Sequence, residues 1–292
     1  MRRLIAAVVA GVAAAAMAPA ASASASTLNI VALGDSSASG VGAGDYEPGT
    51  EGKCFHSANS YTADLVASLR AKGRTVSFTN VTCSGAAIPD LRRTFQDQPP
   101  QLDSLKRDTS IVTLTVGGND IDLASFAGLC IQGDCSGAPA DATIQRLDAM
   151  GQDLRALLKE IKSRSPRAQV VVTGYGRQIT DGANAQGVPL DPICGDGIIT
   201  APERTDGSRI ATALDARLRS VTAGLGTYVS EFAYPGQLRP SFAGHSLCEA
   251  GPSFYRGFDA LAPGQEGPVA VLHLNKAGHA VLASLIEARL CV

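Results

Sequence analysis

Three short stretches of this 292-residue sequence combine glycine with side chains that could take part in chemistry. Residues 34–37 read Gly-Asp-Ser-Ser, residues 83–86 read Cys-Ser-Gly-Ala, and residues 117–120 read Gly-Gly-Asn-Asp. Each comes just after a β-branched run, and open parallel sheets bind ligands beyond the carboxyl ends of their strands. One such turn by itself is typical of a helix cap. Together, the three turns would bring a hydroxyl group, a bare backbone N–H and a side-chain amide to one edge of a sheet.

Those groups are the ones that acyl transfer requires. A nucleophile needs a base beside it, and it needs two or three hydrogen-bond donors aimed at the oxyanion that develops on the substrate. Ser36 is the candidate nucleophile, and the candidate donors are its own N–H, the N–H of Gly85 and the side-chain amide of Asn119. The base must then be a histidine from another part of the chain.

The sequence has four histidines, and His273 is the best candidate for the base. It comes just before the last predicted helix, where a loop could carry the imidazole over the edge of the sheet. His279 lies within that helix and is interpreted as a structural residue. His56 and His245 lie in cysteine-containing loops, and no feature of the sequence favours a catalytic role for them.

The elements that must position these residues alternate along the chain. Five short apolar runs predict strands, and four segments have the periodicity of helices. Near-continuous apolar runs such as residues 111–116 suit strands that are buried on both faces. Strands that alternate with helices indicate an α/β fold with a parallel sheet covered on both faces. The predicted strands are 28–33, 76–81, 111–116, 170–173 and about 228–229, and the predicted helices are 61–72, 143–164, 209–225 and 276–290.

Residues 1–25 predict a secretory signal peptide. Arg2 and Arg3 precede an Ala/Val-rich apolar run that Pro19 interrupts, and Ala-Ser-Ala cleavage sites follow near residues 23 and 25. A retained membrane anchor is the alternative, but no stop-transfer cluster follows the run. We therefore expect a secreted protein without stable membrane insertion, in which residues 26–292 form a single domain.

Charge and composition indicate which kinds of molecule this protein binds. Without Arg2 and Arg3, 23 of the 25 Lys and Arg residues remain against 27 Asp and Glu, and they form no basic cluster. Nucleic acid is therefore not expected as a partner. The chain has no Trp and only 5% aromatic residues, which favours a pocket of aliphatic side chains over a stacking platform for sugars.

Seven cysteines in a secreted chain predict disulfide bonds. Pairing of neighbours in chain order would join Cys54 to Cys83, Cys130 to Cys135 and Cys194 to Cys248, but the sequence alone leaves the connectivity open. The last two of these cysteines fall in long Gly/Pro-rich stretches, residues 181–207 and 235–268, which favours excursions tied by a disulfide. No Cys-x-x-Cys spacing occurs, so we expect no metal site.

In their order along the chain, the three turns and the histidine resemble the SGNH (GDSL) hydrolase superfamily, and particularly the secreted lipases and esterases of actinomycete bacteria. Gly34-Asp35-Ser36 is similar to the Gly-Asp-Ser block of the family and Gly85 to its glycine block. Residues 117–120 are similar to its Gly-x-Asn-Asp block, and His273, with Asn275 two residues on, to its histidine block. Residues 244–248, Gly-His-Ser-Leu-Cys, also resemble a segment that recurs in the secreted members.

The resemblance implies a three-layer α/β/α fold with a flavodoxin-like, parallel five-stranded sheet. It implies a secreted serine esterase or lipase that hydrolyses acyl esters through Ser36 and His273 without a cofactor. We expect a monomer whose partner is a small-molecule or lipid ester. The resemblance also implies the disulfides Cys54–Cys83, Cys130–Cys135 and Cys194–Cys248, which leave Cys291 as the odd thiol.

Two positions depart from the family pattern. Ser37 stands where the Gly-Asp-Ser block usually has leucine, and the usual Asp-x-x-His-Pro block begins with Ala270, so the aspartate of the triad is missing. We therefore predict that a backbone carbonyl, that of Ala270, orients His273. A carbonyl only accepts hydrogen bonds, so it would select the same imidazole tautomer as an aspartate does. A carboxylate recruited from elsewhere, with Asp259 the nearest candidate in the chain, is the alternative.

Other functions fit the sequence less well. An α/β-hydrolase would need a Gly-x-Ser-x-Gly pentapeptide, which is absent, as are metalloprotease and phosphate-binding signatures. A catalytically inactive binding protein on the same scaffold is the alternative from another class, and the missing aspartate supports it. Within the enzyme class, a secreted polysaccharide acetylesterase is the alternative. The presence of the nucleophile, the three donors and the histidine favours an active esterase.

Overall fold

The sheet of this computed structural model has the five parallel strands that the sequence predicts. The structure describes residues 27–180, 190–195, 197–231 and 242–292, so the predicted signal peptide lies outside it. The strand order is β2-β1-β3-β4-β5, which is the order of a flavodoxin-like sheet. The strands are β1 (Leu28–Gly34), β2 (Val76–Asn80), β3 (Ile111–Thr115), β4 (Gln169–Thr173) and β5 (Thr227–Val229).

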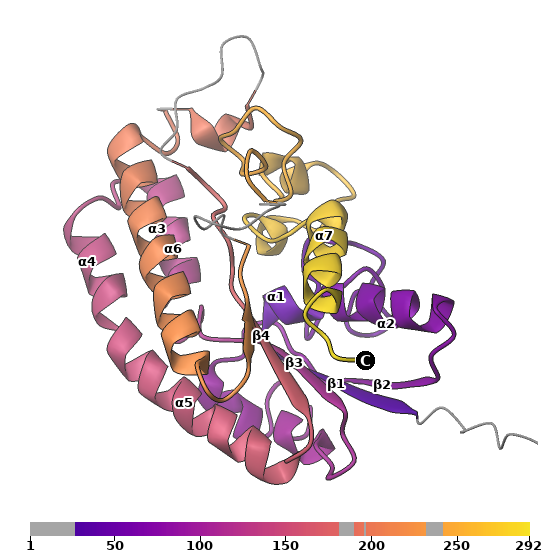
Figure 1. Ribbon diagram of the computed structural model, residues 1–292. Coiled ribbons are helices and arrows are strands. Elements are labelled where there is room, and N and C mark those ends of the chain that lie inside the picture. Colours follow the sequence, from indigo (N-terminus) through magenta and orange to yellow (C-terminus); the bar gives the residue numbers. More distant parts are fainter. Residues whose placement is uncertain (1–26, 181–189, 196, 232–241) are drawn as a thin grey trace, which may run out of the picture.

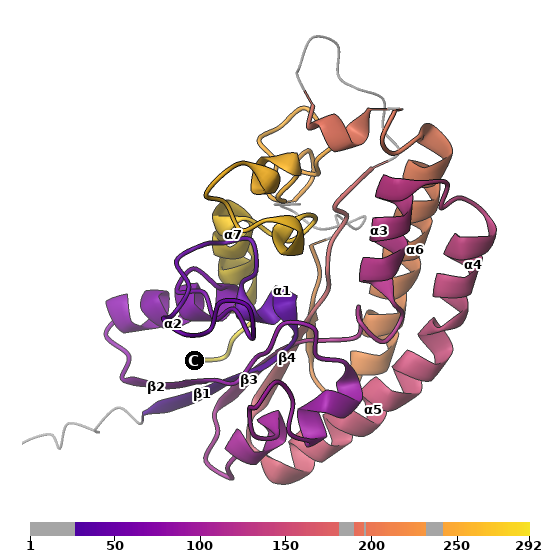
Figure 2. The same ribbon diagram turned by 180° about the vertical axis from the view of Figure 1, so that it is seen from behind.

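Helices cover both faces of the sheet and give the fold three layers (Figures 1 and 2). α2 packs against α7 on one face, and α6 packs against both α4 and α5 on the other. The described helices are α1 (Ser36–Ser39), α2 (Tyr61–Ala71), α3 (Leu123–Gln132), α4 (Ala138–Gln145), α5 (Leu147–Arg164), α6 (Ala201–Thr222) and α7 (Lys276–Glu287). None of these helices is both long enough and apolar enough to cross a membrane.

The burial of each strand follows its place in the sheet. Every residue of the central strand β3 is buried, as its continuous apolar run predicts. β2 lies at the edge, and its residues alternate between half-buried and exposed. The buried threonines of β3 and β4 have hydroxyl partners: Tyr61 Oη lies 2.7 Å from Thr115 Oγ1, which lies 2.5 Å from Thr173 Oγ1, and Thr113 Oγ1 lies 2.8 Å from Thr62 Oγ1. These bonds satisfy buried polar groups beneath the carboxyl ends of the strands.

Two of the four predicted helices differ markedly from the structure, and the other two, 61–72 and 276–290, end one and three residues earlier than predicted. α6 begins at Ala201 and not at Arg209, because the Glu203 carboxylate accepts hydrogen bonds from the N–H and the hydroxyl of Thr200 at 2.7 Å and closes the first turn. The predicted helix 143–164 is divided at Arg146 into α4 and α5. α3, which follows the Gly-Gly-Asn-Asp turn, was not predicted from the sequence.

The turn between β1 and α1 depends on a residue without a side chain. Gly34 has a φ of 129°, and a Cβ atom there would lie 2.1 Å from the carbonyl oxygen of Thr115 on β3. The chain then enters α1, whose N-cap is Asp35 and whose first residue is Ser36. The close approach of β1 to β3 at this point brings their two carboxyl ends together.

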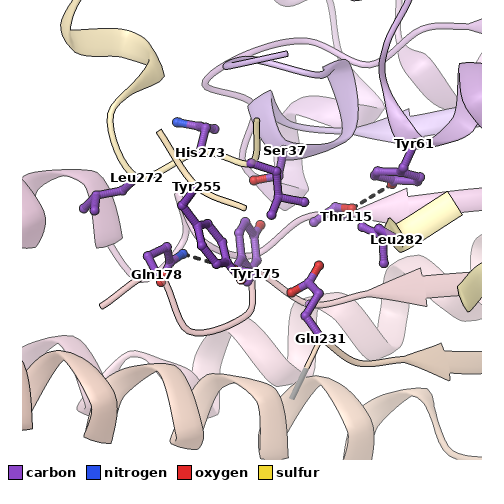
Figure 3. Close-up of a pocket in the computed structure, with 12 residues that line it drawn as sticks. Ser37, Tyr61, Thr115, Tyr175, Gln178, Glu231, Tyr255, Leu272, His273 and Leu282 are labelled. Atoms are coloured by element: carbon purple, nitrogen blue, oxygen red, sulfur yellow. Dashed lines mark hydrogen bonds between the residues drawn. The ribbon is translucent and has the colours of Figure 1, made fainter. Parts of the chain in front are cut away.

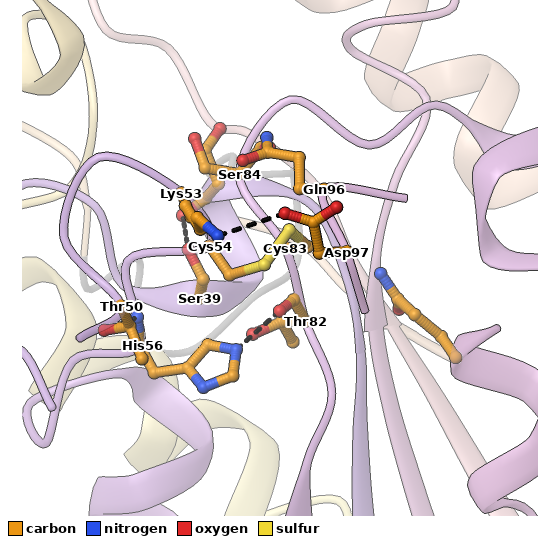
Figure 4. The surroundings of a disulfide bond; sticks show 12 residues. Ser39, Thr50, Lys53, Cys54, His56, Thr82, Cys83, Ser84, Gln96 and Asp97 are labelled. Carbon is orange, nitrogen blue, oxygen red and sulfur yellow. Dashed lines mark hydrogen bonds and ion pairs between the residues drawn. A yellow bond between two sulfur atoms is a disulfide. The ribbon is translucent and has the colours of Figure 1, made fainter. Parts of the chain in front are cut away.

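Three disulfides tie the loops, with the pairing that the family resemblance implies. The bonds are Cys54–Cys83, Cys130–Cys135 and Cys194–Cys248, and Cys291 is free and exposed. Figure 4 shows the surroundings of Cys54–Cys83, which joins the loop after α1 to the turn after β2. In that turn, the Ser84 N–H donates to the carbonyl of Cys54 at 3.2 Å. The disulfide therefore holds the residues that lead directly to Gly85.

We predict that replacing both Cys54 and Cys83 with serine lowers the free energy of unfolding by about 3–4 kcal/mol, because the bond closes a loop of 29 residues. Replacing both Cys130 and Cys135 should cost less, about 2 kcal/mol, because that loop spans only 5 residues. Urea unfolding without reductant measures both values. An equal or larger loss for the short loop would contradict the prediction.

Candidate active site

Ser36 and His273 meet at the carboxyl edge of the sheet. Ser36 Oγ lies 2.8 Å from His273 Nε2, within hydrogen-bonding distance, although 237 residues separate them in the chain. Ser36 is placed by the turn after β1, where the Asp35 carboxylate accepts a hydrogen bond from the Ser37 N–H at 2.9 Å. Both Ser36 and His273 are half-buried. The pair has the geometry of a nucleophile and its base.

The loop before α7 carries His273 to this position. Its backbone pairs with Arg256: the Leu272 N–H donates to the Arg256 carbonyl, and the Arg256 N–H donates to the His273 carbonyl, both at 2.8 Å. Leu272 has a φ of 67°, a left-handed conformation that non-glycine residues seldom adopt. Asn275 then caps α7 by accepting from the Gly278 N–H at 3.0 Å. The loop is thus fixed on both sides of His273.

The prediction that the Ala270 carbonyl orients His273 is wrong. Ala270 ends a short 3-10 turn (Pro268–Ala270), and its carbonyl accepts the backbone N–H of His273 at 3.0 Å. The carbonyl that faces Nδ1 is that of Val271, at 3.4 Å. The distance is long for a hydrogen bond, so the contact is weak. It selects the same tautomer, because a carbonyl oxygen can only accept.

No carboxylate takes the place of the missing aspartate within the described part of the chain. Asp259 binds the Arg256 guanidinium at 2.6 Å and the Gly257 N–H at 2.8 Å, and its side chain is 59% exposed. Glu231 lines a small cavity with His273 (Figure 3), but the carboxyl group of Glu231 makes no hydrogen bond to the imidazole. Burial raises the pKa of Glu231 to about 8, so this group is mostly protonated at neutral pH.

The three residues predicted to supply oxyanion donors, Ser36, Gly85 and Asn119, line one cavity with His273. In the described residues, the N–H groups of Ser36 and Gly85 donate to no protein acceptor. The Asn119 side-chain amide donates one hydrogen to the carbonyl of Ala86 at 2.9 Å. A primary amide has two N–H groups, so the second stays available to a substrate. Gly85 has a φ of 83° and is exposed, which leaves its N–H open to approach.

One residue of the site, Tyr175, which follows β4, was not predicted from the sequence. Its hydroxyl accepts a hydrogen bond from the Gly118 N–H at 2.8 Å and donates one to Asp35 Oδ2. Figure 3 shows the Tyr175 ring beneath Ser37. The only feature of the sequence that points to Tyr175 is its position after the fourth predicted strand. The turn after that strand reaches the same edge of the sheet as the turns after the first three strands.

Burial sets the protonation of the site. It lowers the pKa of His273 to about 4, and the Val271 carbonyl opposes this shift only in part. His273 is therefore neutral at pH 7 and can accept a proton. Burial also raises the pKa of Asp35 to about 7 and that of Asp120 to about 6, although both carboxylates accept backbone N–H bonds.

Each of the other three histidines has a ring nitrogen with a backbone partner away from Ser36. His279 is buried in α7, where its Nδ1 accepts a hydrogen bond from the Tyr61 N–H at 3.1 Å. This contact agrees with the interpretation of His279 as a structural residue. His56 Nε2 lies 2.6 Å from the Thr82 carbonyl, and His245 Nδ1 lies 2.8 Å from the Pro252 carbonyl. No group of acidic, histidine or cysteine side chains suited to a metal ion occurs among the residues that the structure describes.

A large cavity opens from Ser36 and His273 and runs between α3 and α6. Its volume is about 590 Å³, within the range of roughly 300–1,000 Å³ that is usual for small-molecule sites. Most of its walls are apolar. The apolar lining includes Leu123, Phe126 and Ile131 of α3, Ala211 and Leu214 of α6, and Phe258, Val269 and Leu272 of the loops before α7. The cavity suits an extended apolar group attached to the reacting atoms.

Comparison with known proteins identifies one matching family and several related lipases. The GDSL-like Lipase/Acylhydrolase family matches residues 32–281, which include Ser36, Asn119 and His273. The chain is 33% identical over 226 residues to a lipase of Streptomyces rimosus, covering 76% of this chain and 74% of that protein. It is also 31% identical over 225 residues to Lipase 1 of Streptomyces coelicolor, covering 76% of this chain and 74% of that protein.

Two crystal structures resemble the fold over most of its length. The extracellular lipase from Streptomyces rimosus superposes with a TM-score of 0.66 at 26% identity, covering 90% of this chain and 98% of that one. Phospholipase A1 from Streptomyces albidoflavus NA297 gives a TM-score of 0.65 at 26% identity, covering 89% and 98%.

We predict that the contribution of His273 to the free energy of unfolding falls as the pH drops from about 6.5 to about 4, while Asp35, Asp120 and Glu231, whose pKa values are raised, contribute in the opposite direction. The lowered pKa of His273 means that the unfolded chain binds a proton in this range while the folded chain does not. His279 shifts in the same direction, to a pKa of about 3, so the His273→Gln variant isolates one contribution. The difference between the unfolding free energies of the wild type and this variant, measured by urea titration, should therefore fall as the pH drops from about 6.5 to about 4. A difference that did not change with pH would contradict the prediction.

Proposed function

We propose that this chain, which belongs to the GDSL-like lipase/acylhydrolase family and is a carboxylic ester hydrolase, acts through an acyl-enzyme on Ser36 with His273 as general base. The observation that carries the proposal is the 2.8 Å contact between Ser36 Oγ and His273 Nε2. Burial keeps the imidazole neutral at pH 7, so Nε2 has a free lone pair toward the hydroxyl.

In the first half of the reaction, Ser36 Oγ attacks the ester carbonyl carbon while His273 Nε2 takes the hydroxyl proton. The carbonyl oxygen becomes an oxyanion, which accepts hydrogen bonds from the N–H groups of Ser36 and Gly85 and from the free amide hydrogen of Asn119. When the tetrahedral intermediate collapses, the C–O bond to the alcohol breaks. Nε2 returns its proton to the leaving oxygen, and the acyl group remains on Ser36.

In the second half, water attacks the acyl carbon and His273 again serves as base and then as acid. The ester bond to Ser36 Oγ breaks, the carboxylic acid leaves, and Ser36 regains its proton. The Val271 carbonyl, 3.4 Å from Nδ1, keeps the imidazole in the required tautomer throughout. It adds no full negative charge, so the imidazolium is stabilised less than in a triad.

The apolar cavity supports an acyl ester with an extended chain as the substrate. An acetyl group would leave most of its 590 Å³ unfilled, so the cavity gives a polysaccharide acetylesterase little support. The names of the relatives, two lipases and a phospholipase A1, support the same substrate class. The retained Ser36–His273 contact counts against an inactive binding protein.

Secretion is part of the proposal. The predicted signal peptide, the three disulfides of the described residues and the extracellular lipase among the similar structures support it. We also propose that residues 26–292 are one catalytic domain and that the protein acts as a monomer.

We predict that Ser36→Ala lowers kcat for p-nitrophenyl butyrate by about 10⁴-fold or more, because the acyl-enzyme can no longer form. The matched control is Ser37→Ala, the neighbouring hydroxyl, which should stay within about tenfold of wild type. Initial rates at saturating substrate, with circular dichroism to confirm folding, make the comparison. If Ser36→Ala retained activity comparable to the Ser37 variant, Ser36 would not be the nucleophile.

We predict that kcat/KM rises roughly fourfold with each methylene added to the acyl chain from acetate to octanoate, because a buried methylene contributes about 0.8 kcal/mol. A series of p-nitrophenyl esters below their aggregation limits measures this trend. Fastest turnover of the acetyl ester would favour the acetylesterase alternative.

A further inference from the structure

We propose that Tyr175 is a positioning residue, which fixes the turn that carries the oxyanion donor Asn119 against the turn that carries Ser36. This inference rests on the proposed function. The Tyr175 hydroxyl makes one hydrogen bond to each turn: it accepts from the Gly118 N–H at 2.8 Å and donates to Asp35 Oδ2. One oxygen atom therefore connects the residue before Asn119 to the residue before Ser36.

The Tyr175 ring and Gly118 also fit each other closely. A Cβ atom on Gly118 would lie 3.0 Å from the Tyr175 Cε1 and Cζ atoms and 3.2 Å from its hydroxyl oxygen. Contacts this short would force the ring to move. The absence of a side chain on Gly118 thus lets the phenol lie close to the turn, within hydrogen-bonding distance of its backbone.

Asn119 is consequently held from two sides. Its side-chain amide is fixed by the bond to the Ala86 carbonyl at 2.9 Å, and its backbone is fixed one residue earlier by the bond from Gly118 to Tyr175. Because the Gly118 N–H is already used by the phenol, it is not a further oxyanion donor. Tyr175 acts on the reaction only through the place that it gives to Asn119.

The other end of the bridge fixes the nucleophile. Asp35 is 1% exposed and accepts from both the Tyr175 hydroxyl and the Ser37 N–H, so its carboxylate sets the entry into α1. Without the phenol hydroxyl, Asp35 and the Gly118 N–H would each lose a partner in a buried place, which is costly. The two turns would then relax relative to each other. Displacements near 1 Å at a catalytic group can cost about 10²-fold in rate.

The test compares Tyr175→Phe with Tyr228→Phe. Both changes remove one hydroxyl that donates to a buried carboxylate: Tyr228 on β5 donates to Asp215 Oδ1 at 2.7 Å. Both variants should lose similar thermal stability. Only Tyr175→Phe should lower kcat, by roughly 10- to 100-fold. Its KM should stay within about twofold, because phenylalanine keeps the ring that lines the large cavity.

A second readout does not depend on activity. Amide hydrogen exchange at Gly118, followed by NMR, should speed up about tenfold or more in Tyr175→Phe, which removes the acceptor, and should not change in Tyr228→Phe. Equal kcat losses in the two variants, or unchanged exchange at Gly118 in Tyr175→Phe, would overturn the inference. A wild-type protein no more active than Ser36→Ala would overturn the proposed function, and the positioning role would fall with it even where the exchange result holds.

Discussion

The parallel pairing of β1 with β3 is the constraint on which the site depends. The register sets Gly34 beside Thr115, and only a residue without a Cβ atom can lie so close to that carbonyl. Because both strands end at this point, the turns that carry Ser36 and Asn119 start from neighbouring places on one edge. In a sheet of this order, β1 and β3 flank the switch point, where loops diverge and leave room for a ligand.

Much of this arrangement could be predicted from the sequence because the information is local. The strands after which the three turns lie are short apolar runs, and the turns need glycine and capping side chains at fixed places. Ser36, Gly85 and Asn119 could therefore be assigned to one edge before any contact was known. His273 could be chosen because it immediately precedes the helix that Asn275 caps. The fold class followed from the alternation of strands and helices.

The remaining features depend on contacts that no local pattern encodes. The carbonyl at Nδ1 belongs to Val271 and not to Ala270, because Leu272 adopts a left-handed conformation that its residue type does not predict. Tyr175 acts through bonds to residues 57 and 140 positions away. α6 starts early because Thr200 and Glu203 form a capping box at its beginning, in a stretch whose glycines predicted a loop.

Because the aspartate of the triad is missing, the proposed mechanism depends more on the oxyanion donors to stabilise the transition state. Burial without a carboxylate lowers the pKa of His273 to about 4, so the neutral imidazole is a weak base. Removing the serine proton is then less favourable than in a triad, where a charge stabilises the imidazolium. Stabilisation of the transition state must come more from hydrogen bonds to the oxyanion, and preorganised donors supply it without reorganisation. The bond from Asn119 to Ala86 and the Tyr175 bridge provide this rigidity. A dyad with a weak base can therefore operate where its donors are held firmly.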